Sequence, residues 1–329
     1  MSPQAPIPTS YTTWSLPDIK LLHHPASSPV VTPVVIISLD RPAQHNAFTY
    51  RMTESLIVAF DTISDDPRVK AVVLSGGTET GNRFFCAGMD LNMATSKDDK
   101  SSGIKIGDRA ASEEEGKAKA RETHRDGGGR VALSIYNCSK PVIVALNGSA
   151  VGVGITMTLP ANIRIVSSKA KIGFVFARRG LCNEATSSFF LPKLIGSGRA
   201  CHVLTTGSVY PSTSPLFSGM FSEIVEPDNV VERAVAVAED IAKNTSAVST
   251  RVMKDLVFRE MDGPEEAHRL ESMLFWDLFR GRDAEEGMRS FLEKRDARFE
   301  GSVAREEDRP VAWPWWKDDE GRKDVKSKI

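Results

Sequence analysis

The sequence predicts an α/β fold with a helical region at its C-terminal end, and three observations support this class. Apolar runs typical of buried strands alternate with segments of helical periodicity over residues 34–225 of the 329-residue chain. Glycine turns follow several of these runs. From residue 230 to the 290s the pattern is helical. At 41% hydrophobic and 26% charged residues, the composition is that of a globular protein with a substantial core.

Charge and cysteine content exclude several classes of protein. Lys and Arg total 42 against 43 Asp and Glu, a net charge of −1, so the basic excess of a nucleic-acid-binding protein is missing. The four cysteines form no Cys-x-x-Cys pair and no histidines stand at ligand spacing, which argues against a disulfide framework or a metal site and fits a reducing compartment. The length predicts about two domains, at roughly 150 residues each.

Neither the N-terminal residues nor the longest uncharged segment predicts membrane insertion. The first 20 residues have no basic start and no apolar stretch, so they do not resemble a secretory signal. Residues 141–163 carry no charge and are long enough to cross a bilayer. They contain many Gly, Asn, Thr and Pro residues, however, so we expect a buried strand followed by a buried helix.

The first elements form a strand–helix–strand unit. Residues 1–33 are rich in Pro, Ser and Thr and are expected to be an irregular arm. Residues 34–39 form an apolar run and predict a strand, residues 49–63 have helical spacing, and residues 71–74 predict a second strand. We expect the two strands to be parallel, with a right-handed connection.

Residues 95–130 carry charges of both signs and few large apolar side chains. We interpret this segment as a mobile loop followed by a solvated helix that begins at Ser112, with three glutamates in its first turn. A lid over a site and a plain surface insertion are both compatible with this pattern.

Further strands and a helical C-terminal region are expected downstream. Strands are predicted at residues 142–146 and 163–167 with a short one at 173–176, and a helix opens at Gly148. Asp283 with Glu286 predicts a capping box for the last helix. In the polar tail, Trp313, Trp315 and Trp316 are expected to pack on a surface or on a neighbouring subunit. The expected divisions are an arm (1–33), a core (34–225), a helical region (226–300) and a tail (301–329).

Two glycine-containing segments follow predicted strands and are candidates for a ligand site. Residues 85–91 (FCAGMDL) allow a close approach of the backbone, and residues 147–154 (NGSAVGVG) open a helix whose free N–H groups favour an anion. Each signal is weak by itself. The second is neither a dinucleotide fingerprint nor a P-loop, because its spacing differs and no Gly-Lys-Ser/Thr follows.

In this order, four stretches resemble the enoyl-CoA hydratase/isomerase (crotonase) superfamily. The stretches are LDRP and NAF within residues 39–48, FCAGMDL at 85–91, KPVI to Gly148 at 140–148, and residues 283–295. The resemblance implies a crotonase-like spiral of β-β-α turns, a C-terminal helical region that builds homotrimers or hexamers, and acyl-CoA thioesters as substrates. It implies no metal and no cofactor other than the coenzyme A that is part of the substrate.

The resemblance also implies an oxyanion hole made by the backbone N–H groups of Met89 and Val153. Such a hole is aimed at charge that develops in the transition state. The other positions where relatives bind substrate correspond here to Arg41, Ala47, Ala87, Gly88, Asp90, Leu91, Gly152, Phe176 and Lys294.

The positions of the two glutamates that activate water in hydratases of this family are occupied here by Thr156 and Phe176. Neither side chain is a carboxylate base, so hydration by two carboxylates is in doubt. Glu184 stands eight residues later, in a loop (178–193) similar to that of peroxisomal Δ3,Δ2-enoyl-CoA isomerases, which carry one catalytic glutamate there.

The residues around Glu184 agree with a catalytic role. It is the only carboxylate between Lys169 and Gly219, among small and apolar residues, and partial burial would raise its pKa towards neutrality. The alternative is a glutamate at a helix N-terminus that accepts backbone hydrogen bonds. Asp90 can cap the next turn instead of binding substrate, and Arg178 and Arg179 can bind CoA phosphates or be solvated.

We therefore expect a cofactor-independent enoyl-CoA isomerase with Glu184 as proton shuttle. The alternatives are an enoyl-CoA hydratase or dehydratase of peroxisomal or secondary metabolism that uses Glu184 alone, and a catalytically silent acyl-CoA-binding subunit. Ser327-Lys328-Ile329 is close to the Ser-Lys-Leu address of peroxisomes, although a lysine-rich tail can produce it by chance. We expect a peroxisomal import receptor as a partner, with the cytoplasm as the other location.

Overall fold

The computed structural model describes residues 6–91, 122–259 and 261–316. The chain forms two compact units, residues 1–239 and 240–329, and the division falls within α8 (Val230–Asn244). The helix expected from Ser112 and the triplet Ser327-Lys328-Ile329 lie outside the described residues. Within those ranges, no helix is both long and apolar enough to cross a membrane.

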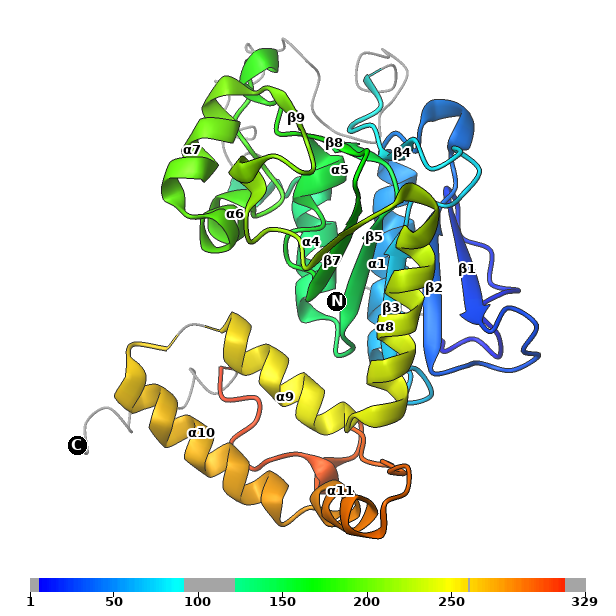
Figure 1. The fold of residues 1–329 in the computed structure, drawn as a ribbon, viewed down its shortest axis with the longest axis vertical. Helices are drawn as coiled ribbons and strands as arrows, with labels where there is room; N and C mark the ends of the chain where they lie inside the picture. Colours follow the sequence, from blue (N-terminus) through cyan, green and yellow to red (C-terminus); the bar gives the residue numbers. More distant parts are fainter. Residues whose placement is uncertain (1–5, 92–121, 260, 317–329) are drawn as a thin grey trace. The chain divides into compact units, whose positions relative to one another are not determined.

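A six-stranded sheet forms the centre of the N-terminal unit (Figure 1). In sheet order its strands are β1 (Ile19–His24), β2 (Val34–Leu39), β3 (Ala71–Ser75), β5 (Val142–Leu146), β7 (Ile163–Ser167) and β10 (Glu223–Val225). From β2 to β10 the strands are parallel. Strands β2, β3 and β5 are buried along their whole length, which explains their continuous apolar runs.

The four long strands predicted from the sequence are confirmed, whereas the prediction of an irregular arm over residues 1–33 is wrong in part. Strand β1 lies within residues 1–33 and pairs antiparallel with β2 over its full length. Its residues alternate between buried and exposed as far as His23, as expected for the edge of a sheet. The surrounding Pro, Ser and Thr residues hid this short alternation in the sequence.

Helix α1 (Tyr50–Asp65) connects β2 to the parallel strand β3, as predicted. Its N-cap is Thr49, whose Oγ1 accepts a hydrogen bond from the Met52 N–H at 3.0 Å. Helix α4 (Gly127–Asn137) packs beside α1 (Figure 1).

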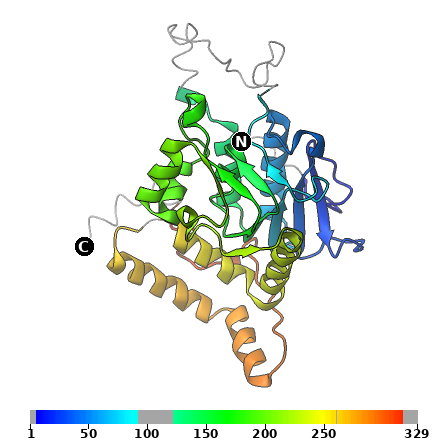
Figure 2. The same cartoon turned by 45° about the horizontal axis from the view of Figure 1, so that its top comes forward.

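A second sheet of four short strands joins the first through a spiral course of the chain (Figure 2). Its strands are β4 (Phe84–Cys86), β6 (Ser149–Val151), β8 (Lys171–Gly173) and β9 (Val209–Pro211). Strands β4, β6 and β8 each follow one strand of the larger sheet, so successive turns of the spiral add a strand to both sheets. The α/β class and the spiral of strands and helices agree with expectation.

Local differences from expectation concern the ends of elements in this part of the chain. Strand β6 follows Gly148, so the helix begins later, as the single turn α5 (Val153–Thr156). The short strand predicted at 173–176 lies earlier, because β8 ends at Gly173, and Phe176 is instead the N-cap of the turn η3 (Ala177–Arg179). The unit is completed by α6 (Ser187–Ile195), α7 (Ser197–Thr206) and the first residues of α8.

The C-terminal unit is helical, as expected. It contains α9 (Ala247–Phe258), α10 (Pro264–Phe279) and α11 (Arg282–Glu293). Val252 on α9 and Leu274 on α10 share a core with Trp315, which is 5% exposed. The Trp313 Nε1–H donates to Asp255 Oδ2 at 2.9 Å. The tryptophans of the tail therefore pack against helices of their own unit.

The predicted last helix is present, but its predicted capping box is wrong. Helix α11 begins at Arg282 with Gly281 as N-cap. The Asp283 carboxylate accepts hydrogen bonds from Ser246 Oγ at 2.6 Å and from the Gly301 N–H at 3.0 Å. Asp283 thus ties α11 to two other segments of its unit.

Candidate active site

The loop after β4 leaves one main-chain donor free. Phe48 and Met89 form an isolated parallel bridge. Across this bridge the Phe48 N–H donates to Gly88 O at 2.8 Å, and the Asp90 N–H donates to Phe48 O at 3.0 Å. The Met89 N–H points to the other side of the strand, and no acceptor for it occurs among the described residues.

The start of α5 supplies a second free donor. Gly152, with φ of 56°, turns the chain from β6 into the helix, a left-handed conformation that favours glycine. The Gly152 carbonyl accepts hydrogen bonds from Ile155 and Thr156. The Val153 N–H is at the first helical position, where no intrahelical acceptor is available, and it has no partner within the described ranges.

These two donors lie on neighbouring turns of the spiral. Strands β4 and β6 are paired, and a Cβ on Gly88 would stand 3.0 Å from Val151 O. A Cβ on Gly154 would stand 2.5 Å from Cys86 O, too close for any side chain. The small residues at these positions allow the two loops to touch, which places both N–H groups at one end of the smaller sheet.

Arg41 and Asp90 support the Met89 loop from within the protein. Arg41 Nη2 donates to Asp90 Oδ2 at 3.0 Å, and Nη1 donates to Ala47 O at 2.5 Å. The two side chains are only 16% and 10% exposed. The Arg41 guanidinium, expected from the resemblance to contact CoA, is therefore engaged by neighbouring loops, and Asp90 forms an ion pair.

The backbone around Glu184 is held in an unusual conformation. Ala185 and Thr186 both have positive φ, of 54° and 56°, although neither is glycine. The Ser187 N–H and hydroxyl both donate to Glu184 O, at 3.1 and 2.6 Å. Strain of this kind persists where the surrounding structure imposes it, and it is common at functional sites.

The Glu184 side chain extends towards α5 and α4. Thr156 Oγ1 lies 2.5 Å from Glu184 Oε1. On the other side, a Cβ on Gly128 would overlap Glu184 Oε2 and stand 2.7 Å from Val153 Cγ2. The carboxyl group therefore lies next to the residue that offers one of the free N–H groups. It does not cap α6, the alternative that the sequence left open.

Burial raises the pKa of Glu184 to about 8. The hydrogen bond from Thr156 acts in the opposite direction, and the nearby Asp126 carboxylate adds to the rise. A carboxyl group with a pKa near neutrality can both accept and donate a proton, as general acid–base catalysis requires.

Asp126 is a site residue that the sequence did not reveal. It is the N-cap of α4, and its Oδ1 accepts a hydrogen bond from the Gly129 N–H at 2.5 Å. Helix α4 begins at Gly127, inside a segment whose charges predicted a loop and a solvated helix. An Asp before a run of glycines is a helix-start signal that could have been used.

The remaining predicted residues lie in different places. Ala87 donates its N–H to His45 O at 3.1 Å, and Leu91 is 55% exposed at the end of the described loop. Phe176 is half-buried before η3. The Arg178 guanidinium binds Thr206 O and Ser208 Oγ rather than being free. Lys294 belongs to the C-terminal unit, where it ends α11.

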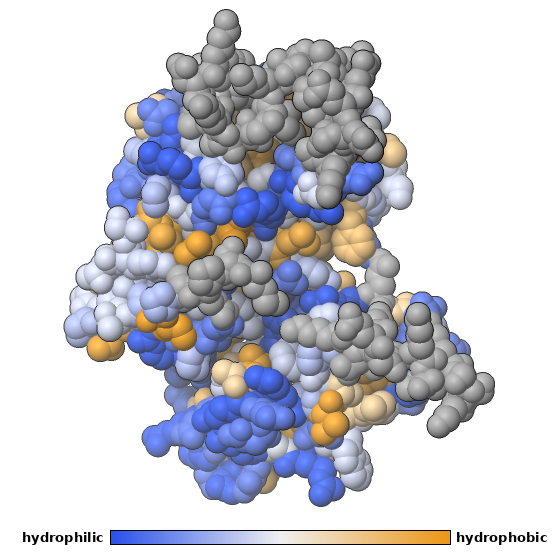
Figure 3. Space-filling view, turned by 180° about the vertical axis from the view of Figure 1, so that it is seen from behind, coloured by the Kyte–Doolittle hydropathy of each residue, from blue (hydrophilic) through white to orange (hydrophobic). Residues whose placement is uncertain are grey.

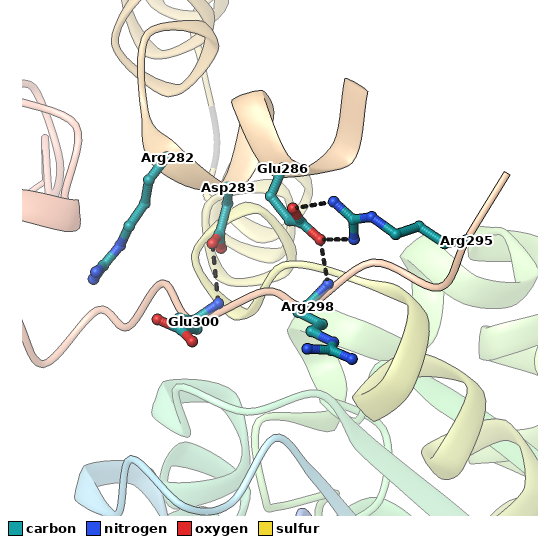
Figure 4. A pocket seen from close by; sticks show the side chains of 6 residues that line it. All are labelled: Arg282, Asp283, Glu286, Arg295, Arg298 and Glu300. Carbon is teal, nitrogen blue, oxygen red and sulfur yellow. Dashed lines mark hydrogen bonds and ion pairs between the residues drawn. The ribbon is translucent and has the colours of Figure 1, made fainter. Parts of the chain in front are cut away.

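A separate cavity of about 450 Å³ lies within the C-terminal unit (Figure 4). Its lining is Arg282, Asp283, Glu286, Arg295, Arg298 and Glu300. Arg295 binds both oxygens of Glu286, which holds the pKa of this glutamate at about 2. Opposite charges pair inside this cavity, so it does not offer the free donors of the first site. Within the described ranges, no cluster of three or more His, Cys, Asp or Glu residues could hold a metal ion.

Comparisons with known proteins agree with the spiral fold. Residues 31–302 match the family model described as enoyl-CoA hydratase/isomerase. Enoyl-CoA hydratase ACTT3 of Alternaria alternata is 44% identical over 271 residues, which are 82% of this chain and 84% of that protein. Enoyl-CoA hydratase EchA19 of Mycobacterium tuberculosis is 27% identical over 266 residues, 81% of this chain and 92% of that one.

Among solved structures, Pseudomonas aeruginosa DspI superposes with a TM-score of 0.72 at 25% identity and covers 88% of this chain and 100% of its own. A probable enoyl-CoA hydratase/isomerase from Mycobacterium abscessus gives a TM-score of 0.69 at 25% identity, with 85% and 98% covered. ACTT3 and EchA19 both carry the name enoyl-CoA hydratase, and none of the four names supports the specific likeness of residues 178–193 to peroxisomal isomerases.

Proposed function

The chain belongs to the enoyl-CoA hydratase/isomerase family of enzymes, and from this premise we propose that it isomerises 3-enoyl-CoA thioesters to 2-enoyl-CoA thioesters. The observation that carries the proposal is the position of Glu184. Its partly buried carboxyl group lies beside Val153, whose N–H is free. By the resemblance to the family, Thr156 and Phe176 take the places of the two carboxylates of a hydratase.

In this reaction the thioester oxygen accepts hydrogen bonds from the Met89 and Val153 N–H groups. The Glu184 carboxylate removes a proton from C2, and the electron pair of the C–H bond moves to form an enolate. The neutral acid then gives the same proton to C4 as the double bond moves from C3–C4 to C2–C3. No net proton, water or cofactor is consumed. Loss of one such donor typically costs about 3–4 kcal/mol of transition-state stabilisation.

The test is to incubate the purified protein with a 3-enoyl-CoA and, separately, with a 2-enoyl-CoA. We expect a shift of the double bond in the first reaction without a hydroxyacyl product. Glu184→Gln should abolish this reaction, whereas Glu122→Gln, a change at an exposed residue, should retain it. Full activity in Glu184→Gln would refute the assignment, and no turnover of any acyl-CoA would favour a catalytically silent subunit.

Hydration is the second candidate, because three relatives from Alternaria alternata that are each 44% identical carry the name enoyl-CoA hydratase. In hydration by Glu184 alone, the carboxylate would take a proton from the water molecule whose oxygen bonds to C3, and would then return this proton to C2 of the 2-enoyl-CoA. Both reactions therefore start from the ionised form of Glu184, whose pKa is about 8, and kcat/KM of either reaction should rise with pH through this value. The product separates them, because only hydration yields a 3-hydroxyacyl-CoA.

We also propose that the enzyme is a homotrimer or a hexamer built by its C-terminal unit. Phe275 and Trp276 on α10 are 67% and 63% exposed, and Phe291 and Leu292 on α11 are 83% and 80% exposed. Apolar side chains also reach the surface in Figure 3. Exposed apolar groups of this size favour burial against another chain. Light scattering should give three or six chain masses, and Phe291→Asp should lower this number.

For localisation, we propose that Ser327-Lys328-Ile329 acts as a peroxisomal address where it stands at a chain end. A fluorescent reporter that ends in this triplet should enter peroxisomes, and one that ends in Ser-Glu-Ile should stay in the cytoplasm. Equal distribution of the two reporters would contradict the proposal.

A further inference from the structure

The first turn of α4 brings a second carboxyl group to Glu184. Asp126 is the N-cap of this helix, and Gly127, Gly128 and Gly129 follow it. Gly128 is so close to the Glu184 carboxyl that any side chain there would overlap it. A Cβ on Gly129 would stand 2.6 Å from Asp126 Oδ2. The run of three glycines thus leaves room for two acidic side chains at one helix end.

The two carboxyl groups interact directly. Both lie against the first turn of α4, Glu184 at Gly128 and Asp126 at Gly129, and the closeness of Asp126 raises the pKa of Glu184 by favouring a hydrogen bond between the two groups and by like charge. Two carboxylates can share such a bond only when one of them carries a proton. The free N–H groups at the start of α4 favour negative charge at Asp126, and one of them binds its Oδ1. The proton of the pair therefore belongs on Glu184.

No other charged side chain competes for Glu184 on the described elements packed against it. Helix α5 contributes Thr156 and Val153, which are neutral. The basic residues near Asp126 in the chain are engaged elsewhere. Arg125 donates to the carbonyl oxygens of its neighbours Glu122 and His124, and Arg130 binds Glu54 on α1.

We propose that Asp126 is a positioning residue of the active site, which accepts a hydrogen bond from the neutral form of Glu184 and so keeps the reacting proton on that side chain. The inference rests on the proposed role of Glu184 as proton shuttle. When Glu184 takes the C2 proton of the substrate, the Asp126 carboxylate stabilises the resulting acid and orients it. When the proton leaves for C4, the electron pair of the O–H bond returns to Glu184.

The chain offers a matched variant that separates this role from helix capping. Asn is as good an N-cap as Asp, so Asp126→Asn should keep the hydrogen bond to Gly129 and the start of α4. It removes the negative charge that acts on Glu184. Asp126→Ser serves as a second variant. It also retains a capping oxygen, but the shorter serine side chain places this oxygen farther from the Glu184 carboxyl group.

The experiment measures the pH dependence of kcat/KM on 3-enoyl-CoA for the wild type and both variants. In both variants we expect the rising limb of the kcat/KM profile to lie at lower pH than in the wild type, by roughly one pH unit. A neighbouring like charge shifts the pKa of a carboxyl group by this order or more. Well below the original midpoint this change is a gain of roughly tenfold in the fraction of ionised Glu184. A purely structural role for Asp126 would lower the rate at every pH and leave the midpoint in place.

A second readout does not depend on turnover. Carbon-13 NMR of protein labelled at glutamate side chains, with Glu184 assigned from Glu184→Gln, follows the titration of this group directly. We expect its midpoint to fall in Asp126→Asn. An unchanged midpoint in folded Asp126→Asn would overturn the inference even if the wild type is an active isomerase. A wild type that does not isomerise 3-enoyl-CoA would refute the proposed function, while the NMR titration would still decide the role of Asp126.

Discussion

Gly128 and Glu184 approach each other so closely that no side chain fits between the first turn of α4 and the glutamate carboxyl group. The same position on α4 is 2.7 Å from Val153 Cγ2, measured to an added Cβ. One glycine therefore determines whether the carboxyl group of Glu184 can lie next to Val153, the two residues that we propose as proton shuttle and oxyanion donor. The positions of these groups depend on three separate segments, α4, α5 and the loop before α6.

Gly128→Ala should move the Glu184 carboxyl away from its working position. A displacement of about 1 Å at a reacting group can cost about 100-fold in rate, so we expect a loss of this order in kcat. The control is Gly198→Ala on α7, where an added Cβ meets no atom within 4 Å. Steady-state kinetics of both variants checks the prediction, and wild-type kcat in Gly128→Ala would contradict it.

Thr156→Val should raise the pKa of Glu184 further, because the hydrogen bond from Thr156 lowers it. The rising limb of isomerase kcat/KM should then move to higher pH. Loss of a partner for a buried polar group should also cost about 1–3 kcal/mol of stability. Thr156→Ser retains the hydroxyl and should retain the wild-type profile. Identical pH profiles for the Val and Ser variants would refute this role of the hydroxyl.

Glu184→Gln should change how stability depends on pH. The folded pKa of about 8 is above the ordinary value of 4.5, so the folded protein binds this proton more tightly than the unfolded chain does. The resulting stabilisation is complete below pH 4.5 and is lost as pH rises through 8, by about 1.4 kcal/mol for each pH unit between these two values. The variant should therefore gain stability relative to the wild type over this interval. Melting temperatures measured from about pH 5 to about pH 9, which spans the titration, test this, and a constant difference across the range would contradict it.

Breaking the ion pair between Arg41 and Asp90 should destabilise the loop that carries Met89. Both side chains are largely buried, so Arg41→Met or Asp90→Asn removes one charge of a buried ion pair and should cost about 3 kcal/mol. We expect kcat to fall as well, because the Met89 N–H follows the loop. The exposed pair Lys20–Glu79 is the control, and Lys20→Met should change stability by less than about 1 kcal/mol. In a double-mutant cycle, additive effects at Arg41 and Asp90 would show that the pair is not coupled.

The strands that the sequence predicted well are those buried on both faces. In β2, β3 and β5 every residue is buried, and such strands stand out as continuous apolar runs. Strand β1 was missed because its alternation is short and lies among Pro, Ser and Thr residues. Strand β1 is stabilised by pairing with β2, and a local sequence pattern does not indicate such pairing between two segments.

The candidate site was predictable in part for a similar reason. Met89 and Val153 were implied by the resemblance to the family, and Glu184 by the resemblance of residues 178–193, with which its isolation among small and apolar residues agrees. Asp126 is far from all three in the sequence, and only the packing of α4 brings it to Glu184. Asp283 illustrates the converse, because a capping pattern was present while tertiary contacts used the side chain differently.

The free donors of Met89 and Val153 belong to peptide bonds, and this has an evolutionary consequence. Every amino acid except proline offers the same N–H group, so a substitution at either position would change the side chain and leave the proposed oxyanion donor in place. Under the proposed function, evolution could therefore change which acyl groups are accepted at these two positions without loss of the oxyanion donors.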